Sequence, residues 1–340
     1  METKLRWGII GTGSIARKFA RGLKESLTGQ LVAVGSRGQE TVQSFIAEFP
    51  ARGHASYEAL VGDPDVEAVY ISTPHPMHAQ WAINAARAGK HILCEKPFTM
   101  NAAEAVAVID AARAAGVFLM EAFMYRCHPQ TARIIELLKE GRIGRARLVQ
   151  ATFSFRAAWD PASRLLNKEL GGGGILDVGC YCASMSRLVA GVTVGAPFAD
   201  PIEVKGVGQI GDTGADELAV AVLQFPGGMM AQLCAGLRVN LDNTVRIWGE
   251  EGHIVAPSPW VVNRDAAESH LMVHRDGAEA ERVTIRSERS IYAYEADAVA
   301  AALAAHESPA MSWADTLGNM QTLDRWREQI GLRYAADGIS

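Results

Sequence analysis

Residues 5–16 read LRWGIIGTGSIA, an apolar run that passes directly into a glycine-rich turn. The turn has the spacing G-x-G-x-x-A over Gly11, Gly13 and Ala16, and an amphipathic stretch follows it. The first glycine of this pattern permits a tight turn, and the second lets a pyrophosphate approach the backbone, which the first amides of the helix then bind. The stretch predicts a dinucleotide-binding unit of strand, turn and helix. A tight turn of purely structural role is the alternative.

The chain on either side of this unit has two different patterns. Up to about residue 125, short apolar runs such as 30–34, 68–72 and 91–94 alternate with helical stretches. This alternation predicts a parallel sheet with right-handed crossovers, so we expect a doubly wound Rossmann domain over residues 1–125. Residues 126–340 instead contain successive strand-like segments and two closing helices. There we expect an α+β domain on a mixed, largely antiparallel sheet, which serves substrate binding and oligomerisation.

The composition excludes several classes of protein. The net charge is −5, hydrophobic residues make up 49% of the 340 residues, and no lysine- or arginine-rich run is present. A basic face is the usual footprint of a nucleic-acid-binding protein, so we expect no such partner. No apolar run approaches the ~18 residues of a membrane span, and glycine comes too early in METKLRWGIIGTG for a signal peptide. These features predict a cytoplasmic protein without a membrane partner.

The five cysteines have no Cys-x-x-Cys spacing. Cys94 and Cys234 lie in apolar runs and are expected to be buried thiols in a reducing compartment. Cys180 and Cys182 could bind a metal, but no second pair of ligands is nearby in the sequence. We therefore predict five free thiols and no metal.

The end of the second predicted strand, Val34-Gly35-Ser36-Arg37, carries no acid. A site for NAD usually has Asp or Glu there to hold the ribose hydroxyls, whereas Glu40 lies within the next helix. A serine hydroxyl and an arginine guanidinium suit a 2′-phosphate instead. We predict NADP as the cofactor, with NAD as the second choice. The alternative is an arginine in a solvated turn.

A lysine stands at the end of the predicted strand 91–94, within HILCEKPF. Glu95 and Lys96 bring two charges to this point, and Pro97 cannot donate to a sheet ladder. Because the carboxyl ends of parallel strands face the ligand crevice, Lys96 is a candidate site residue.

A second candidate segment is ELGGGGILDVGCYCASM, residues 169–185. Asp177 and Tyr181 are four residues apart on a predicted helix, so their side chains are neighbours. We interpret the glycine run 171–174 as a place where the chain comes close to a flat ligand. The alternative is that Asp177 charges the start of a helix and Tyr181 packs at its rim.

Together these motifs resemble the glucose-fructose oxidoreductase, inositol dehydrogenase and rhizopine-catabolism (Gfo/Idh/MocA) family over nearly the whole chain. The matching segments are Gly11 to Ala16, Thr73-Pro74-His75 with His78, Ala88 to His91, Glu95-Lys96-Pro97, and Gly171 to Tyr181. In having tyrosine at position 181, the chain resembles the branches of dihydrodiol dehydrogenase and the aldose dehydrogenases. Inositol dehydrogenase-like members carry histidine at this position. The stretch MEAFMYRCHPQ, residues 120–130, also resembles the aldose and sugar-ketoreductase branches.

The resemblance implies roles for individual residues. Lys96, Asp177 and Tyr181 would be catalytic, with Lys96 reaching the reacting oxygen. The residues expected to bind the cofactor are Gly11, Gly13, Ser14, Ile15, Ser36, Arg37, Thr73, Pro74, His75, His78, Glu95 and Lys96, although a structural role is the alternative for His78. The residues expected to contact substrate are Lys96, Asp177 and Tyr181, as the resemblance implies, and also Arg126, Trp159 and Arg164, because aromatic and polar side chains suit a sugar. The two arginines and Trp159 could equally serve packing or the surface.

The resemblance therefore predicts an NADP-dependent oxidoreductase that moves a hydride between nicotinamide and a carbinol or carbonyl carbon of a sugar or cyclic polyol. Aldose oxidation at C1, keto-sugar reduction and trans-dihydrodiol oxidation all stay open. A cofactor-binding regulatory protein is the rival from another class, and the retention of both Lys96 and Tyr181 disfavours it. The expected assembly is a homodimer or homotetramer.

Overall fold

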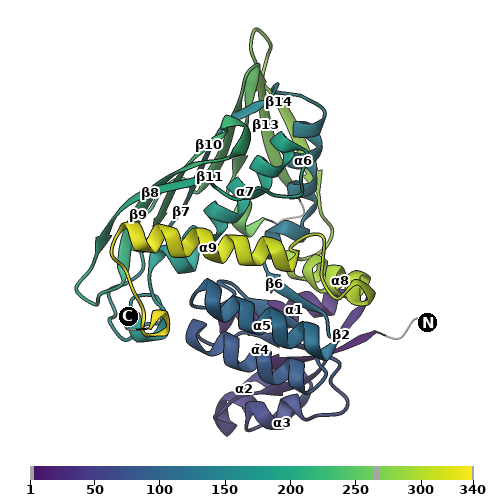
Figure 1. Ribbon diagram of the computed structural model, residues 1–340. Helices are drawn as coiled ribbons and strands as arrows, with labels where there is room; N and C mark the ends of the chain where they lie inside the picture. Colours follow the sequence, from purple (N-terminus) through teal and green to yellow (C-terminus); the bar gives the residue numbers. More distant parts are fainter. Residues whose placement is uncertain (1–3, 263–267, 339–340) are drawn as a thin grey trace. The chain divides into compact units, whose positions relative to one another are not determined.

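The computed structural model describes residues 4–262 and 268–338, which divide into two compact units (Figure 1). Unit 1 holds the described residues of 1–99, 103–127 and 288–316, and unit 2 holds those of 100–102, 128–287 and 317–340.

Unit 1 is built on a six-stranded sheet in which every neighbouring pair is parallel. Its strands are β1 (Leu5–Ile10), β2 (Gly29–Gly35), β3 (Arg52–His54), β4 (Ala68–Ile71), β5 (His91–Glu95) and β6 (Leu119–Ala122). They lie in the order β3-β2-β1-β4-β5-β6, the doubly wound order in which ligands bind at the carboxyl ends of the strands near β1 and β4. The predicted Rossmann fold is confirmed.

Helices connect these strands, as the alternating pattern predicts. They are α1 (Ser14–Glu25), α2 (Gln39–Glu48), α3 (Tyr57–Val61), η1 (His75–Met77), α4 (His78–Arg87), α5 (Ala102–Ala115) and η2 (Met124–Cys127). Strand β4 is fully buried along its length, because a parallel sheet with helices on its faces leaves no side of a central strand open to solvent.

The returning segment 288–316 belongs to unit 1, whereas a boundary at residue 125 assigns it to the second domain. Its helix α8 (Ile291–Ala302) packs on α1, where a Cβ on Gly22 would lie 2.5 Å from Cβ of Tyr292. The Ser26 hydroxyl also donates to Asp297 at 2.6 Å. These contacts join segments about 270 residues apart, so the local sequence pattern gave no sign of them.

Unit 2 contains a mixed sheet of eight strands in the order β14-β13-β12-β11-β7-β10-β9-β8. The strands are β7 (Ala146–Ser154), β8 (Glu203–Ile210), β9 (Asp216–Gln224), β10 (Met230–Gly236), β11 (Thr244–Gly249), β12 (Gly252–Pro257), β13 (Glu268–Arg275) and β14 (Glu281–Arg286). Only β7 and β10 pair in parallel, and the remaining neighbours are antiparallel. The predicted mixed, largely antiparallel sheet is confirmed.

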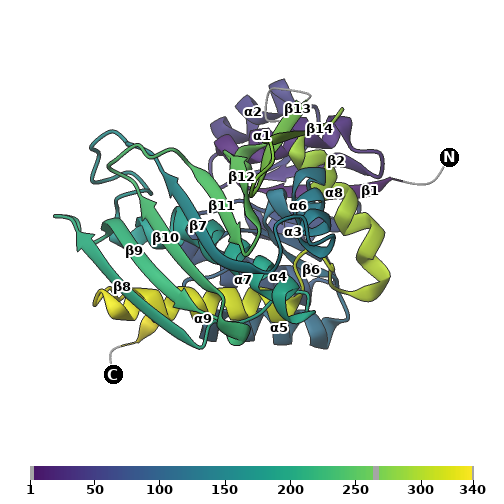
Figure 2. The ribbon, with the colours of Figure 1, turned by 90° about the horizontal axis from the view of Figure 1, so that it is seen from above.

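Helices cover one face of this sheet, as Figure 2 shows for α7 and α9. The helical elements of the second half of the chain are α6 (Pro129–Lys139), η3 (Lys168–Leu170), the π-helical turn η4 (Ile175–Gly179), α7 (Cys180–Val194), η5 (Pro226–Gly228), η6 (Pro259–Val261), η7 (Leu303–Ala305), α9 (Trp313–Gln329) and η8 (Ala335–Asp337). Helix α7 packs on β7 and β10, and Trp326 of α9 packs on Gly206 of β8. The opposite face of the sheet carries exposed apolar side chains, among them Val207, Val222 and Met230.

Within the described residues, one helical stretch is long and apolar enough by composition to cross a membrane. It is Lys168–Val194, whose most apolar 18-residue window has a mean hydropathy of 1.3, and it contradicts the expectation that no apolar run approaches that length. However, 89% of its most apolar window is buried inside the protein, as in the core helix of a globular domain.

Candidate active site

The glycine-rich turn between β1 and α1 is shaped for a close ligand. Gly11 has a φ of +105°, and its amide donates to the Gly35 carbonyl at 2.9 Å. Gly13 precedes the first turn of α1, and a Cβ placed there would meet nothing within 4 Å. The backbone at Gly13 is therefore open at the amino end of a helix, where amides and the helix dipole favour a phosphate.

Two side chains follow at the carboxyl end of β2. The Ser36 hydroxyl is buried and lies 2.9 Å from the Thr41 hydroxyl. Arg37 is exposed, and among the described residues it makes no hydrogen bond, ion pair or ring contact. An unpaired guanidinium beside a hydroxyl is a suitable recognition pair for a 2′-phosphate.

The carboxyl end of β4 carries an orphaned polar atom. Thr73 is buried, and its hydroxyl has no hydrogen-bond partner in the described chain. Such a group usually costs about 1–3 kcal/mol unless a ligand or water pairs with it. Together with the open Gly13 and the unpaired Arg37, Thr73 shows that this edge of the sheet fits a dinucleotide.

His75 and His78 differ from one another in burial and contacts. His78 is fully buried, with Nδ1 2.9 Å from the Pro97 carbonyl and Nε2 2.9 Å from the Thr73 carbonyl. Burial lowers its pKa below the usual value. His78 thus joins the loops after β4 and β5, which is the structural role weighed from the sequence. His75, 5% exposed, begins the short helix η1 and lies 5.7 Å from His78 between ring centroids.

Lys96 directly follows β5, where the sequence predicted it. Glu95 is buried beside it and accepts hydrogen bonds from the Tyr70 hydroxyl and, at 3.1 Å, from the Lys96 amide. Burial, followed by the Glu95 charge, raises the pKa of Tyr70 well above its usual value. The side chain of Glu95 therefore fixes the backbone that carries Lys96, and the Lys96 side chain is half-buried.

In unit 2, Asp177 and Tyr181 lie one helical turn apart at the start of a long helix. Asp177 is on the π-helical turn η4 and Tyr181 on the first turn of α7, and each is 4% exposed. Arg164 donates to Asp177 through Nη1 at 3.0 Å. A single π-helical turn inside a helix is uncommon and is frequent at functional sites.

Aromatic side chains hold the Tyr181 ring within unit 2. The Phe153 ring of β7 meets it edge-on at 5.2 Å, and the Trp260 ring lies 5.9 Å away between centroids. Trp260 is itself anchored, because its indole N–H donates to the Thr152 carbonyl at 2.8 Å. The ring orientation of Tyr181 is thus set by neighbours that the sequence analysis missed.

The glycine run before this helix contradicts our interpretation of it as a surface for a flat ligand. A Cβ on Gly172 would lie 2.7–2.8 Å from the carbonyl oxygens of Arg164, Leu165 and Asn167. A Cβ on Gly173 would clash with the Asp216 carboxylate, and φ at Gly173 is +136°. The chain at these two glycines comes close to its own backbone and side chains.

The predicted substrate residues Arg126 and Trp159 have different surroundings. Arg126 is buried in an ion pair with Asp315 and donates to the Ala310 carbonyl at 2.9 Å, contacts that account for its burial. Trp159 is 48% exposed, and the Arg238 guanidinium lies 5.3 Å from its ring centroid. Trp159 is therefore available to a ligand, whereas Arg126 is held by contacts within unit 1.

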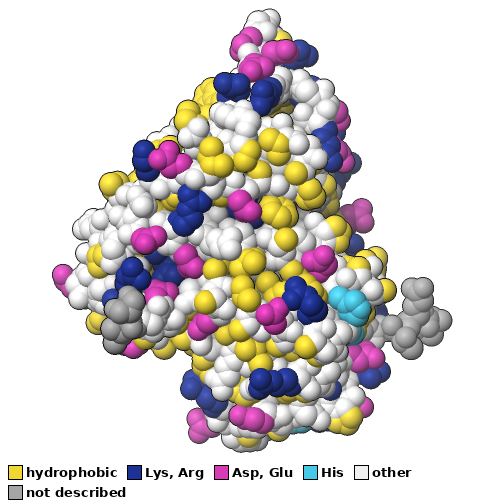
Figure 3. All heavy atoms as spheres, in the orientation of Figure 1, with side chains coloured by type: hydrophobic (Ala, Val, Ile, Leu, Met, Phe, Trp, Pro, Cys, Tyr) yellow, Lys and Arg dark blue, Asp and Glu magenta, His cyan; other side chains and the backbone are white. Residues whose placement is uncertain are grey.

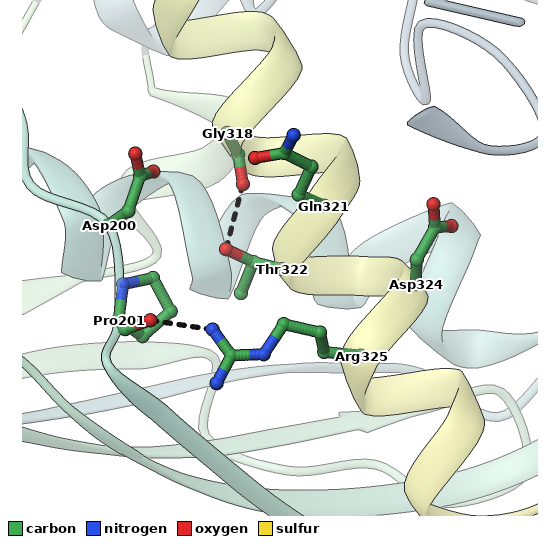
Figure 4. Close-up of a pocket in the computed structure, with 7 residues that line it drawn as sticks. All are labelled: Asp200, Pro201, Gly318, Gln321, Thr322, Asp324 and Arg325. Atoms are coloured by element: carbon green, nitrogen blue, oxygen red, sulfur yellow. Dashed lines mark hydrogen bonds between the residues drawn. The ribbon is translucent and has the colours of Figure 1, made fainter. Parts of the chain in front are cut away.

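A separate pocket of about 330 Å³ lies in unit 2 (Figure 4). It is lined by Asp200, Pro201, Gly318, Gln321, Thr322, Asp324 and Arg325, none of which is a predicted site residue. Its charged groups are already paired, since Arg325 donates to the Pro201 carbonyl at 2.6 Å and the two aspartates pair with Arg187 and Arg327. We therefore do not assign the active site to this pocket.

Two further predictions concern charge and metal. On the face that Figure 3 shows, basic and acidic side chains are interspersed, and no continuous basic stripe is seen there. The described residues contain no group of three or more His, Cys, Asp or Glu side chains that could hold a metal ion. None of the five cysteines, all of which lie among the described residues, forms a disulfide, and burial raises the pKa of the Cys94 and Cys182 thiols well above the usual value.

The chain matches two family models. One, described as an oxidoreductase family with an NAD-binding Rossmann fold, covers residues 5–123, and the GFO/IDH/MocA C-terminal domain covers residues 131–255.

Named proteins match along nearly the full chain. Trans-1,2-dihydrobenzene-1,2-diol dehydrogenase of Mus musculus is 33% identical over 98% of this chain and 99% of its own. D-xylose 1-dehydrogenase (NADP(+)) 2 of Haloferax volcanii is 32% identical over 94% and 95%. A crystal structure of a 3-ketoreductase from Actinomadura kijaniata with NADP and TDP-benzene has a TM-score of 0.86 and 28% identity over 96% and 98%.

Proposed function

The chain belongs to the GFO/IDH/MocA oxidoreductase family, and we propose that it transfers a hydride between NADP and a carbinol or carbonyl carbon of a sugar or cyclic polyol. The observation that carries the proposal is the pair Asp177 and Tyr181, one helical turn apart, nearly buried and held by Arg164 and two aromatic rings. A tyrosine held in this way is a candidate proton acceptor rather than a surface residue.

The residues of unit 1 would hold the cofactor in a way that favours NADP. Gly11, Gly13 and the first amides of α1 would bind the pyrophosphate, Ser36 and Arg37 the 2′-phosphate, and the Thr73 hydroxyl would find a partner. The naming of NADP in the xylose dehydrogenase and the ketoreductase supports this choice. When bound, the nicotinamide supplies the carbon that accepts or donates the hydride.

The chain's own residues would accept the substrate's proton and stabilise the negative charge that develops on its oxygen. In the oxidising direction Tyr181 would take the hydroxyl proton of the substrate, and the Lys96 ammonium would stabilise the oxygen as negative charge develops on it. A free tyrosine is a poor base near neutrality, and an ammonium within ~4–6 Å favours its phenolate form. Asp177, fixed by Arg164, would orient a substrate hydroxyl or the lysine.

The substrate class rests on the chemistry around Tyr181. Arg164 is half-exposed beside Asp177, and Trp159 offers an exposed aromatic face. An aromatic face with converging polar groups suits a sugar or a cyclic polyol. The names of the diol dehydrogenase, the xylose 1-dehydrogenase and the 3-ketoreductase correspond to a diol oxidation, a C1 oxidation and a ketone reduction respectively, so we propose the carbinol and carbonyl chemistry that the three share.

A panel of free sugars, polyols, keto-sugars and a trans-dihydrodiol tests this function. Each compound is offered with NADP or NADPH, and with NAD or NADH, while the nicotinamide absorbance is followed. We expect turnover of at least one compound, faster with the phosphorylated cofactor. Cofactor binding without turnover of any compound would favour the rival, a regulatory protein that senses the dinucleotide.

We further propose that the protein acts in the cytoplasm as a homodimer or homotetramer. The open face of the eight-stranded sheet supports the assembly. Val207, Val222, Met230 and Trp248 are 72%, 48%, 48% and 37% exposed, and the strand register places them on the same face. Exposed apolar side chains gathered on one face are typical of an interaction surface. A second copy of this chain is the occupant that we propose.

A charge on this face should disrupt the assembly. We expect Val222→Lys to lower the mass by light scattering, whereas Leu27→Lys should leave it unchanged, because Leu27 is 68% exposed on unit 1. A monomeric wild-type protein at micromolar concentration would refute the proposal.

A further inference from the structure

The helix that bears Asp177 and Tyr181 begins against a buried carboxylate from another element. Ile175, the first residue of η4, donates its amide to Oδ2 of Asp216 at 2.8 Å. Asp216 is the first residue of β9 and is 0% exposed. Because the first amides of a helix lack partners within it, a carboxylate there satisfies them and complements the helix dipole. Asp216 therefore satisfies one of the amides at the start of this helix.

A tyrosine near the end of the chain contacts the same turn. The Tyr334 hydroxyl donates to the Gly172 carbonyl at 2.7 Å, and Tyr334 is 5% exposed. A Cβ on Gly173 would lie 2.8 Å from this hydroxyl and would also clash with Asp216. Asp216 and Tyr334 thus hold the glycine run on two sides, directly before the turn that carries Asp177.

The position of Tyr334 is in turn fixed by helix α9. The Arg327 guanidinium lies 5.1 Å from the Tyr334 ring centroid and donates to Asp337 at 2.8 Å. The Tyr334 amide donates to the same Asp337 carboxylate at 2.8 Å. The segment that contains Tyr334 and Asp337 is therefore held against helix α9.

The held segment connects directly to the proposed catalytic residues. The Asp177 amide donates to the Gly173 carbonyl at 3.1 Å, so a shift at Gly173 moves Asp177. Tyr181 follows on the next turn of the same helix. We propose that Asp216 and Tyr334 are positioning residues, which set the start of this helix and so place Asp177 and Tyr181 for hydride transfer. This inference rests on the proposed function.

The test separates a positioning role from general stability. Asp216→Ala removes the acceptor of the Ile175 amide, whereas Asp216→Asn keeps an oxygen that can accept it. A misplacement of about 1 Å can cost ~10²-fold in rate, so we expect kcat to fall roughly 10- to 100-fold in Asp216→Ala. We expect about a threefold loss in Asp216→Asn and a roughly three- to tenfold loss in Tyr334→Phe, each with unchanged affinity for NADP.

Two matched variants in unit 1 serve as controls. Asp63 is also a buried carboxylate that accepts a backbone amide, from Asp65 at 2.9 Å. Tyr57 is a buried tyrosine, 6% exposed. Asp63→Ala should therefore lower stability, and both Asp63→Ala and Tyr57→Phe should leave kcat of the folded protein near the wild-type value. Equal losses of kcat in Asp63→Ala and Asp216→Ala would overturn the proposal.

A second readout does not depend on activity. Hydrogen exchange in peptides that cover residues 170–182 should be faster in Asp216→Ala and Tyr334→Phe than in the wild type, and unchanged in the two controls. If the wild-type protein turned over no compound, the proposed function would fail, and exchange alone would then decide this inference. Unchanged exchange in both variants would contradict it, whatever the activity.

Discussion

Two glycine-rich turns each precede a helix in this chain, and they serve opposite purposes. At Gly13 the space beside the backbone is open, whereas at Gly172 and Gly173 it is filled by backbone carbonyls and the Asp216 carboxylate. The same residue type therefore leaves room for a ligand in one unit and permits close packing in the other. What occupies the space decides between the two, and at the second turn the occupants come from distant parts of the sequence.

Substitution of alanine at the two turns should differ most in its effect on the free energy of unfolding. Gly173→Ala would place a methyl group on the Asp216 carboxylate in a left-handed backbone conformation, and we expect a loss of about 3 kcal/mol or more. Gly13→Ala meets open space at ordinary angles, so its stability should stay within about 0.5 kcal/mol. Denaturant unfolding measures both changes.

The affinity for NADP should depend on the first turn, because the substitution that hardly changes stability, Gly13→Ala, lies where the pyrophosphate would bind. Gly13→Ala should weaken NADP binding by roughly tenfold or more, because a methyl group occupies the approach of the pyrophosphate. A Gly13→Ala protein that binds NADP normally, or a stable Gly173→Ala protein, would break the comparison.

The carboxylate that packs against the second glycine-rich turn, Asp216, has a shifted pKa. Burial raises the pKa of Asp216 from 3.8 to about 6, so the folded protein binds this proton more tightly than the unfolded chain. Stability should therefore fall as the pH rises from about 4 to about 6 and level off above, by roughly 3 kcal/mol if the full shift applies. Asp216→Asn should remove this component. An unchanged pH dependence in Asp216→Asn would show that Asp216 does not titrate in this way.

Ser36 and Arg37, which follow β2, should determine the preference for NADP over NAD. Arg37→Ala removes a guanidinium that has no partner in the described chain, so stability should hardly change. A charge-assisted hydrogen bond is worth ~1.5–3 kcal/mol, so the preference for NADP over NAD should fall roughly tenfold to a hundredfold. Fluorescence titration with both cofactors measures it, with Arg113→Ala as a surface control. Equal binding of NAD and NADP by the wild type would contradict the assignment of Ser36 and Arg37.

The sequence predicted the first unit well, because its signals are local. Strand, turn and helix follow one another over Leu5–Ile10 and Ser14–Glu25, and the buried run AVYI of β4 has the composition of a central parallel strand. The family, the fold class and the enzyme class are confirmed. The strands β12–β14 went unpredicted: β12 is a short run that ends in Pro257, and charged residues stand at both ends of β13 and β14.

The contacts of Asp216 and Tyr334 with the second glycine-rich turn could not be predicted from the sequence in the same way. Asp216 lies 41 residues from Ile175, and Tyr334 lies 162 residues from Gly172. The only local sign is an acid at the start of an apolar strand, since Asp216 precedes the alternating segment of β9. The π-helical turn at Asp177 has no sequence signature of its own. Such contacts depend on the tertiary fold rather than on the period of apolar residues.

Stopped-flow measurement of hydride transfer in Lys96→Met, Tyr181→Phe and the double variant tests the central claim most directly. General acid–base catalysis contributes ~10²–10⁴-fold, so Tyr181→Phe should lose that factor with nearly unchanged NADP affinity, and Lys96→Met should lose at least as much. The double variant should be little worse than the worse single, because the two groups act on one oxygen. Near-normal turnover in either single variant, with normal folding and NADP binding, would contradict the account.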